Sequence, residues 1–316
     1  MEFAPVGIYT YTRLNHLEKT IESLKRNTRA RDTELFVFSD GPRPGDEIKV
    51  ENLRSYLKGV TGFKRLHVVA QGTNDMFKNI IGSQHFLSEN YSKYILMEDD
   101  IVTSPHFLDF MNEALVKYEF DKRVMSIGGY CPPIRFPKNY KQDTFFAQIF
   151  CPWGLGMWAD RFRQIISSLD FTEPTLNRFL QIELKFRGKN LLRRFKALPQ
   201  RPLIESDLLS TYDLVATALM LKSGMHTLLP RKTMVKNIGL DETGLHCSVN
   251  DSRFSENVDE DFKPTELPSK TEIDHRIVGE MYLLQSFSKP KTRLMNNFYL
   301  MTRKLDYLMG KIRQPS

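Results

Sequence analysis

The chain has 316 residues, of which 41% are hydrophobic and 26% are charged, and its formal net charge is +7. This composition is typical of a globular protein with one large domain or two smaller ones. Three cysteines, an odd number without C-x-x-C spacing, argue against a disulfide framework or a zinc knuckle.

No basic-then-apolar leader opens the sequence, and no apolar run reaches the roughly 18 residues that a membrane-spanning helix needs. We therefore expect a soluble or peripheral protein of the reducing cytoplasm. The positive charge calls for an anionic partner, and nucleic acid, phospholipid and sugar nucleotide all fit that description.

Strand-like and helix-like segments alternate along the first third of the chain. Short apolar runs occupy residues 4–11, 34–40, 65–70 and 93–97. Helical apolar spacing follows the first three runs, near residues 14–24, 50–57 and 78–89. This alternation predicts an α/β fold with a mainly parallel sheet covered by helices on both faces, and ligands bind at the carboxyl ends of such strands.

The segments that follow predict further helices and a long loop. Ser104 and Pro105 offer an N-cap and a first-turn proline for a helix with an apolar face up to Tyr118. A second helix is predicted over residues 207–222, and residues 236–270 have the composition of a loop.

Three adjacent carboxylates, Glu98, Asp99 and Asp100, follow the fourth apolar run. Like charges beside an apolar interior repel one another and lose solvation, so they should protonate or meet a cation. Enzymes that move phosphate-bearing groups hold Mg²⁺ or Mn²⁺ by one or two carboxylates together with the substrate's phosphates. The alternative is a solvated turn whose last carboxylate faces a helix dipole.

Asp213 is the only charged residue between Leu208 and Leu221, in a segment that is apolar on every side. Such a helix is expected to be buried, and burial tunes a carboxylate towards the role of general base. A carboxylate satisfied by backbone groups or by an arginine is the structural alternative.

Other motifs in the second half give weaker signals. "GLGMWA" at 154–159 matches G-x-G-x-x-A, but its mid-chain position favours a tight turn beside an acceptor pocket over a dinucleotide site. His246 lies in a glycine-containing loop that could close over a substrate, although a lone loop histidine is more often without such a role.

Two basic segments also stand out. "RGKNLLRRFK" at 187–196 suggests either a solvated face or a surface for an anionic glycan or lipid. Residues 289–316 carry seven basic residues against one acidic residue at helical apolar spacing, which predicts a basic amphipathic helix. That helix would either lie on the inner face of the membrane or pack against the main domain.

The motifs in their order resemble the GT-A fold glycosyltransferases, and more narrowly N-acetylglucosaminyltransferase I and its bacterial relatives. The resemblance covers residues 4–250 and rests on six quoted segments. They are "YTRLNHL", "FSDGP", "MEDDIVTSPHFLDFMNEAL", "PWGLGMW", "TYDL" and "NIGLDETGLHC". It implies a GT-A catalytic domain over residues 1–250, with a nucleotide-sugar half to about residue 130 and an acceptor half beyond it. Residues 251–316 would then be a loop and a C-terminal helical extension.

The resemblance also implies roles for single residues. Arg13 and Asp40 would contact the nucleotide, and Glu98-Asp99-Asp100 matches the family's Glu-Asp-Asp form of the Asp-x-Asp motif, whose last carboxylate binds the metal. Asp100 is thus the expected ligand of Mn²⁺ or Mg²⁺. Asp213 matches the catalytic base, and His246 lies in a loop that orders over the donor.

Two departures concern donor and acceptor contacts. Asp75 stands where relatives commonly carry glycine, and Tyr212 stands where they often carry tryptophan.

The expected activity is inverting, metal-dependent transfer of a sugar from a nucleotide sugar, with UDP-sugar as the expected donor, to a hydroxyl of a glycan or lipid-linked acceptor. Such chemistry belongs to polysaccharide synthesis in a bacterium. A sugar nucleotidyltransferase is the alternative enzyme, although the N-terminus offers no glycine-rich phosphate loop. A nucleic-acid-binding protein is a further alternative, but the sequence contains no recognised nucleic-acid motif, so nucleic acid is not the expected partner.

Overall fold

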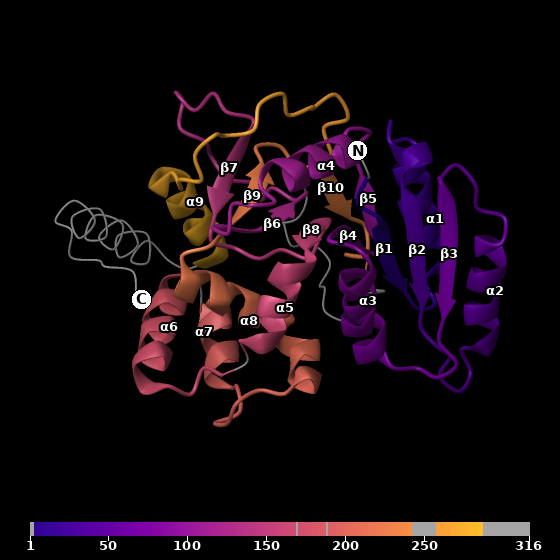
Figure 1. Ribbon diagram of the computed structural model, residues 1–316, viewed down its shortest axis with the longest axis horizontal. Coiled ribbons are helices and arrows are strands. Elements are labelled where there is room, and N and C mark those ends of the chain that lie inside the picture. Colours follow the sequence, from indigo (N-terminus) through magenta and orange to yellow (C-terminus); the bar gives the residue numbers. More distant parts are fainter. Residues whose placement is uncertain (1–2, 169, 188, 242–256, 287–316) are drawn as a thin grey trace.

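The computed structural model describes residues 3–168, 170–187, 189–241 and 257–286 (Figure 1). Its centre is an eight-stranded sheet in the order β3-β2-β1-β4-β8-β6-β9-β7, and β5 and β10 form a separate antiparallel pair. The strands are β1 (Val6–Thr10), β2 (Glu34–Ser39), β3 (Arg65–Ala70), β4 (Lys93–Glu98), β5 (Ile101–Thr103), β6 (Val124–Gly128), β7 (Thr144–Ala147), β8 (Leu155–Trp158), β9 (His226–Pro230) and β10 (Val235–Asn237).

Helices flank the sheet along its length. They are α1 (Leu14–Lys25), α2 (Glu47–Leu57), α3 (Met76–Asn90), α4 (Phe107–Lys117), α5 (Ala159–Ser167), α6 (Pro174–Arg187), α7 (Lys189–Lys196), α8 (Leu208–Ser223) and α9 (His275–Ser286), with 3-10 turns η1 (Ala30–Asp32) and η2 (Glu205–Asp207). Figure 1 shows β3 and α2 at one end of the molecule and α6 and α9 at the other.

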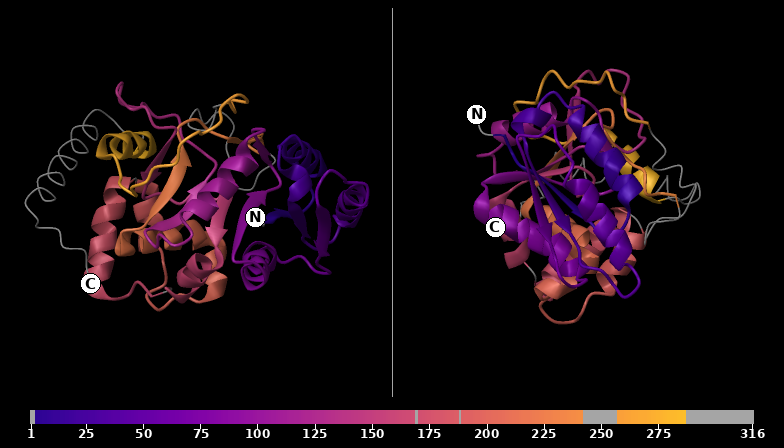
Figure 2. Two further views of the ribbon diagram at one scale, coloured as in Figure 1. Left: turned by 45° about the horizontal axis from the view of Figure 1, so that its top comes forward. Right: turned by 90° about the vertical axis from the view of Figure 1, so that its right-hand side faces the viewer.

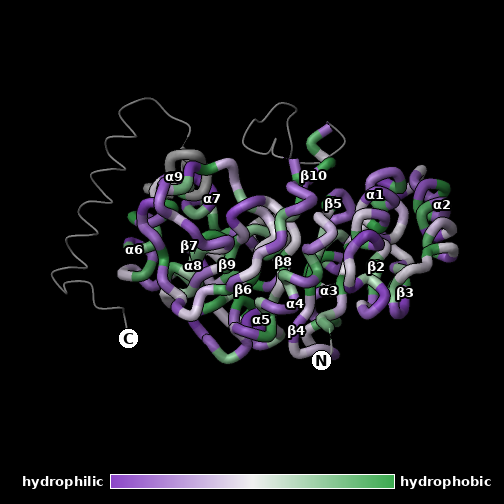
Figure 3. Tube along the Cα trace, turned by 90° about the horizontal axis from the view of Figure 1, so that it is seen from above, coloured by the Kyte–Doolittle hydropathy of each residue, from purple (hydrophilic) through white to green (hydrophobic). Residues whose placement is uncertain are grey.

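The predicted alternation of strands and helices is confirmed for the first four strands, which are mutually parallel. Side chains on one face of these strands pack with α1, α2 and α4, and those on the other face pack with α3, α5 and α8. A mainly parallel sheet with helices on both faces is therefore the architecture of this chain. Figure 3 shows apolar and polar residues interspersed along the trace of the helices and strands.

The order of the central strands could not be read from the local sequence. β8 lies between β4 and β6 and is antiparallel to both, while β6 and β9 are parallel. Gly156 in β8 packs so closely on α4 that a Cβ there would lie 2.9 Å from the Met111 methyl group. Gly154 adopts a φ of +65° directly before β8, which residues 155–158 form. The two glycines of "GLGMWA" thus serve the backbone turn before β8 and the packing of β8 on α4.

The predicted N-cap of α4 was wrong by two residues. α4 begins at Phe107, after His106, and the buried hydroxyl of Ser104 has no hydrogen-bond partner among the described residues. Pro105 and His106 form a turn, and the backbone amide of Phe107 donates to the Ser104 carbonyl. The turn uses the backbone of Ser104 where the sequence suggested its side chain.

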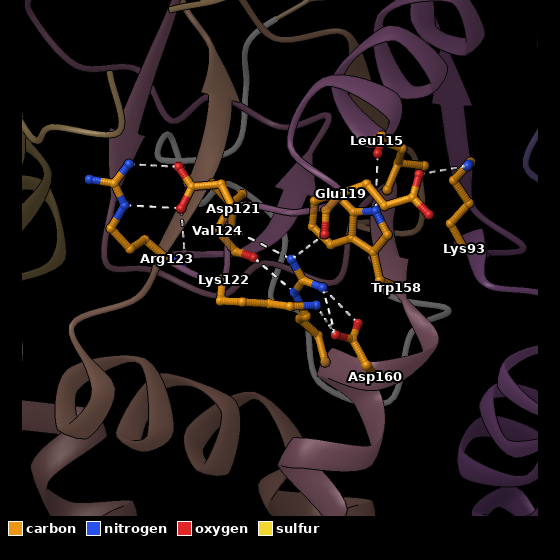
Figure 4. Close-up of polar contacts among 10 residues, drawn as sticks. Lys93, Leu115, Glu119, Asp121, Lys122, Arg123, Val124, Trp158 and Asp160 are labelled. Atoms are coloured by element: carbon orange, nitrogen blue, oxygen red, sulfur yellow. Dashed lines mark hydrogen bonds and ion pairs between the residues drawn. The ribbon is translucent and has the colours of Figure 1, made fainter. Parts of the chain in front are cut away.

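A buried arginine joins the loop before β6 to the start of α5. Arg161 is only 1% exposed, and its guanidinium donates to the carbonyls of Glu119, Asp121 and Val124. It also pairs with the Asp160 carboxylate at 2.7 Å and lies 4.5 Å from the Trp158 ring centroid. Figure 4 shows these partners around one point. A buried charge is tolerable here because each side of the guanidinium meets an acceptor or an aromatic face.

The described part of the C-terminal region packs on the same body. The side chains of Lys117 and Tyr118 donate to the carbonyls of Leu267 and Pro268, and Ile273 bridges to Phe146 of β7. α9 contacts α6, as Figure 2 shows. Among the described helices, none combines the length and apolarity required to cross a bilayer. The domain boundary expected at residue 250 remains a prediction.

Candidate active site

The three carboxylates lie at the carboxyl end of β4, near the middle of the sheet. Glu98 ends β4, Asp99 and Asp100 form the turn, and Ile101 begins β5. Glu98 is the register partner of Tyr9 on β1, and Tyr9 packs with the cluster that contains α8. The strand geometry therefore directs Glu98 towards the α8 face of the sheet, and Asp99 towards the opposite face.

Both carboxylate oxygens of Asp99 accept hydrogen bonds from neighbouring side chains. Its carboxylate accepts from the Thr10 hydroxyl at 2.8 Å and from the Arg13 guanidinium, and its carbonyl accepts from the Thr20 hydroxyl at 2.8 Å. With both oxygens occupied, Asp99 fixes the turn against α1 and β1.

The two carboxylate oxygens of Asp100 differ in their surroundings. Its Oδ2 pairs with Arg13 Nη1 at 2.8 Å, whereas its buried Oδ1 has no hydrogen-bond partner among the described residues. Burial raises the pKa of Asp100, Arg13 opposes that rise, and the neighbouring Asp99 adds to it. An oxygen of this kind is a natural ligand for a hard cation.

Residues 237–241 pack directly on this turn. The amide of Ile238 donates to the Asp100 carbonyl at 2.9 Å, and the amide of Gly239 donates to the Asn237 side chain. A Cβ at Gly239 would overlap Asp100 Oδ2 and would lie 2.8 Å from Arg13 Nη1. Only glycine allows the chain to approach the carboxylate this closely.

Glu98 carries the most perturbed carboxyl group of the turn. Although part of its surface is exposed, desolvation, Asp100 and Asp99 together raise the pKa of Glu98 to about 8. A hydrogen bond from Tyr9 and the charge of Arg13 act in the opposite direction. Arg13 pairs with Asp99 and Asp100, and its charge also acts on Glu98, so an additional cation would further relieve the repulsion among the three acids.

The turn fits a divalent cation that is shared with a substrate. Within the described residues, no three His, Cys, Asp or Glu side chains converge into a ready-made metal cluster. Mg²⁺ and Mn²⁺ sites of phosphate-handling enzymes need only one or two carboxylates, since the substrate's phosphates and water supply the other ligands. Asp100 Oδ1 meets that requirement.

The expectation that Asp213 is buried was wrong. Asp213 lies in the first half of α8, where its side chain is 38% exposed, whereas the residues that follow it, 214–221, are buried. Its two oxygens accept a bidentate pair from Arg194 of α7, at 2.6 and 2.8 Å. The arginine alternative considered from the sequence is thus the one that the structure contains. The position of Asp213 on its helix does not reveal this ion pair, because its partner, Arg194, comes from α7.

Tyr212, next to Asp213, and Tyr9, the register partner of Glu98, pack against the same apolar cluster. Burial raises the pKa of the Cys151 thiol to about 12, and the negative charges of both Glu98 and Asp213 contribute to that rise. Tyr212, beside Asp213, donates to the Gln84 side chain of α3 at 2.9 Å and packs edge-on against Phe150. The fold therefore brings the β4 turn and the start of α8 to the same face of the sheet.

Asp40 organises the loop after β3. Its carboxylate accepts from the amides of Gly41 and Asp75 and from the Asn74 side chain, at 2.8–2.9 Å. A Cβ at Gly41 would overlap the backbone of Thr73. Asp75, at the position that departs from the family pattern, caps α3 by accepting from the Lys78 amide. A nucleotide contact of Asp40 remains a prediction.

The structure adds residues that the sequence did not single out. His16 Nε2 on α1 lies 3.1 Å from Asp241 Oδ2. In the sequence, Arg194 shows no signal beyond its membership of the basic run 187–196, and Gly239 is one glycine of the loop that contains His246. His246 and residues 289–316 lie outside the described residues, so their predicted roles are untested.

The sequence comparisons and the structure comparisons gave different results. No family model matches the sequence, and no curated protein sequence matches it. Solved structures give partial matches. TarS from S. aureus is 12% identical over 74% of this chain and 36% of its own length, with a TM-score of 0.37.

A mannosyltransferase, PcManGT from Pyrobaculum calidifontis, solved with GDP-Man and Mn²⁺, is 11% identical over 70% of this chain and 74% of its own, with a TM-score of 0.35. A cytidylyltransferase from Leptospira borgpetersenii is 10% identical over 53% of this chain and 65% of its own, with a TM-score of 0.31. At this level of similarity, none of them establishes an activity or a substrate for this chain.

Proposed function

We propose that this protein is an inverting, metal-dependent glycosyltransferase that uses a nucleotide sugar, with a UDP-sugar as the donor. The observation that carries the proposal is Asp100 Oδ1, a buried carboxylate oxygen that has no hydrogen-bond partner in the described part of the chain. It lies in a turn of three acids, two of which, Asp99 and Asp100, pair with Arg13. Asp213, on the same side of the sheet, supplies a second carboxylate within reach of solvent.

The acidic turn would bind the diphosphate of the donor. Asp100 would hold a divalent ion, Mn²⁺ or Mg²⁺, and the bound ion would offset the charge that develops on the leaving phosphate. Arg13 fixes Asp99 and Asp100 relative to each other, and by analogy with the resembled family it would also face the nucleotide. Asp40 would act near the base and ribose, and His246 near the bound donor.

Asp213 would act as the general base. The acceptor hydroxyl attacks the anomeric carbon while its proton passes to Asp213. The carbon–oxygen bond to the diphosphate breaks, and its electron pair leaves with the nucleotide. A single displacement of this kind inverts the configuration and requires no covalent enzyme intermediate.

Arg194 leaves room for that proton transfer. A carboxylate offers about four lone-pair positions, and the bidentate arginine occupies two of them. Because the planar guanidinium fixes the plane of the carboxylate, the remaining positions have a defined direction. Arg194 is therefore a positioning residue for the proposed base.

The wider setting is part of the same proposal. The acceptor would be a glycan or lipid-linked hydroxyl in bacterial polysaccharide synthesis. The protein would work in the cytoplasm, with residues 289–316 as a peripheral contact on the inner face of the membrane. The catalytic domain would extend over residues 1–250, divided near residue 130.

Asp213→Asn tests the chemistry. It should keep the affinity for UDP in the presence of Mn²⁺ and lower sugar transfer by roughly a hundredfold or more, because the amide cannot accept the proton. Asp207→Asn is the matched control, since Asp207 is also paired bidentately with an arginine, Arg201, at the start of the same helical region. Equal turnover in both variants would exclude Asp213 as the base. Release of pyrophosphate in place of nucleoside diphosphate would indicate the nucleotidyltransferase alternative.

A further inference from the structure

An open groove lies between α6 and α7, away from the acidic turn. Its volume is about 630 Å³, which is within the range of ~300–1,000 Å³ that ligand pockets have. The side chains that line it include Asn177, Arg178, Gln181, Ile182, Leu192 and Lys196. Figure 1 shows these two helices beside α8, at the end of the molecule opposite β3 and α2.

The groove lies in the most basic stretch of the described chain. Residues 174–201 contain eight lysines and arginines and one acidic residue, Glu183, and two of these cations, Arg194 and Arg201, pair with Asp213 and Asp207. Arg178 and Lys196 are exposed and form no ion pair within the described residues. Because these two cations line the same groove and repel each other, the groove would gain from an anionic ligand.

The other lining groups suit a carbohydrate. Gln181 donates to Asn177 at 2.6 Å, which holds the two amides in place, and each amide retains groups that can pair with hydroxyls. Ile182, 48% exposed, and Leu192 offer apolar surface for the C–H faces of a sugar ring. A neutral glycan would not need the two cations.

α7 joins this groove to the proposed base. Lys196 and Leu192 of α7 line the groove, while Arg194 of the same helix reaches across to Asp213. A polymer in the groove would therefore be separated by α7 alone from Asp213, the carboxylate that is proposed to activate the acceptor.

We infer that the α6–α7 groove binds an anionic acceptor glycan, one that carries phosphate or carboxylate groups. This inference rests on the proposed function and names the class of its acceptor. Arg178 and Lys196 pair with the charges of the glycan, and the amides and apolar walls contact its sugar rings.

The test measures binding to the full chain without donor or metal. The probe is a fluorescein-labelled phosphorylated dextran oligomer, compared with the same oligomer without phosphate, and the readout is fluorescence anisotropy. The groove variant is R178E together with K196E, and R178Q with K196Q is a milder version. The matched control is K58E with R65E, since Lys58 and Arg65 are exposed, make no ion pair in the described chain and lie at the α2 and β3 end.

The inference predicts that the wild type binds the phosphorylated oligomer more tightly than the neutral one. The groove variant should weaken binding roughly tenfold or more, because each reversed charge turns an attraction into a repulsion. The glutamine variant should fall between, and the control should stay near the wild type.

Three results would overturn the inference. They are equal losses in the groove variant and the control, equal binding of neutral and phosphorylated oligomers, and binding of phosphatidylglycerol vesicles without binding of the oligomer. The last result would assign the surface to membranes. Mn²⁺-dependent UDP binding, measured separately, shows whether the proposed function itself has failed.

Discussion

Replacing Gly239 by alanine would place a methyl group inside the acidic turn. The added Cβ would overlap Asp100 Oδ2, and it would lie 2.8 Å from Arg13 Nη1 and 2.9 Å from Asp100 Cγ. Non-bonded heavy atoms prefer separations of about 3.5–4.0 Å, so either the loop or the Asp100 carboxylate must move by roughly 1 Å. Both belong to a buried network, and neither can move without breaking a hydrogen bond or an ion pair.

The expected cost is about 1–3 kcal/mol in the free energy of unfolding, as for other overpacked sites. We also expect Gly239→Ala to weaken Mn²⁺-dependent UDP binding, because the displaced carboxylate no longer presents Oδ1 in its present direction. Urea unfolding gives the first quantity, and the thermal shift with UDP and Mn²⁺ gives the second.

Gly59→Ala serves as the control. Its nearest heavy atom would be the Tyr56 carbonyl oxygen at 3.7 Å, an ordinary van der Waals contact. If Gly239→Ala unfolds like Gly59→Ala and keeps the full Mn²⁺-dependent shift, then the close approach of the loop to Asp100 has no functional consequence.

Three further changes test the framework around the site. Arg161→Met should lower the free energy of unfolding by about 3–5 kcal/mol, because it leaves the Asp160 carboxylate and buried carbonyls without this donor. A decrease of less than about 1 kcal/mol, measured by urea unfolding, would contradict this account. Thr10→Val should lower the free energy of unfolding by about 1.5–3 kcal/mol, because the hydrogen bond to Asp99 is lost. An unchanged urea midpoint would show that this bond contributes nothing to stability. Burial and the charge of Arg123 lower the pKa of His226 to about 4, while Asp121 acts in the opposite direction. As the pH falls, the unfolded chain therefore binds the extra proton before the folded chain does. The free energy of unfolding should fall by up to about 3 kcal/mol between pH 6.5 and pH 4. His226→Phe should flatten that part of the pH profile, and an equally steep profile would assign the effect to other groups.

Local pattern predicted the first half of the fold well. The first three strands are short apolar runs, each followed by helical spacing, and such units form parallel sheets with few alternatives. The same reasoning placed the acidic turn at a strand end. It could not place β8 between β4 and β6, because that pairing joins segments far apart in the chain and has no signature in either one.

The candidate site was predicted less completely than the sheet. The sequence predicts the acids at 98–100 as a cluster and a nucleotide contact for Arg13, but it does not reveal that Arg13 pairs with Asp99 and Asp100. The apolar surroundings of Asp213 suggested burial, and only the position of α7 shows that Arg194 meets it at a partly exposed point. Side-chain partners of this kind depend on tertiary placement, which helical periodicity does not encode.

The most direct test of the central claim is UDP binding with and without Mn²⁺, measured by calorimetry on the wild type, on Asp100→Ala and on Asp32→Ala, an exposed carboxylate in η1. If Asp100 holds the cation that a diphosphate shares, Mn²⁺ should tighten UDP binding by roughly tenfold in the wild type and in Asp32→Ala, and should have no effect in Asp100→Ala. An equal Mn²⁺ effect in all three proteins, or none in the wild type, would contradict the proposed metal site.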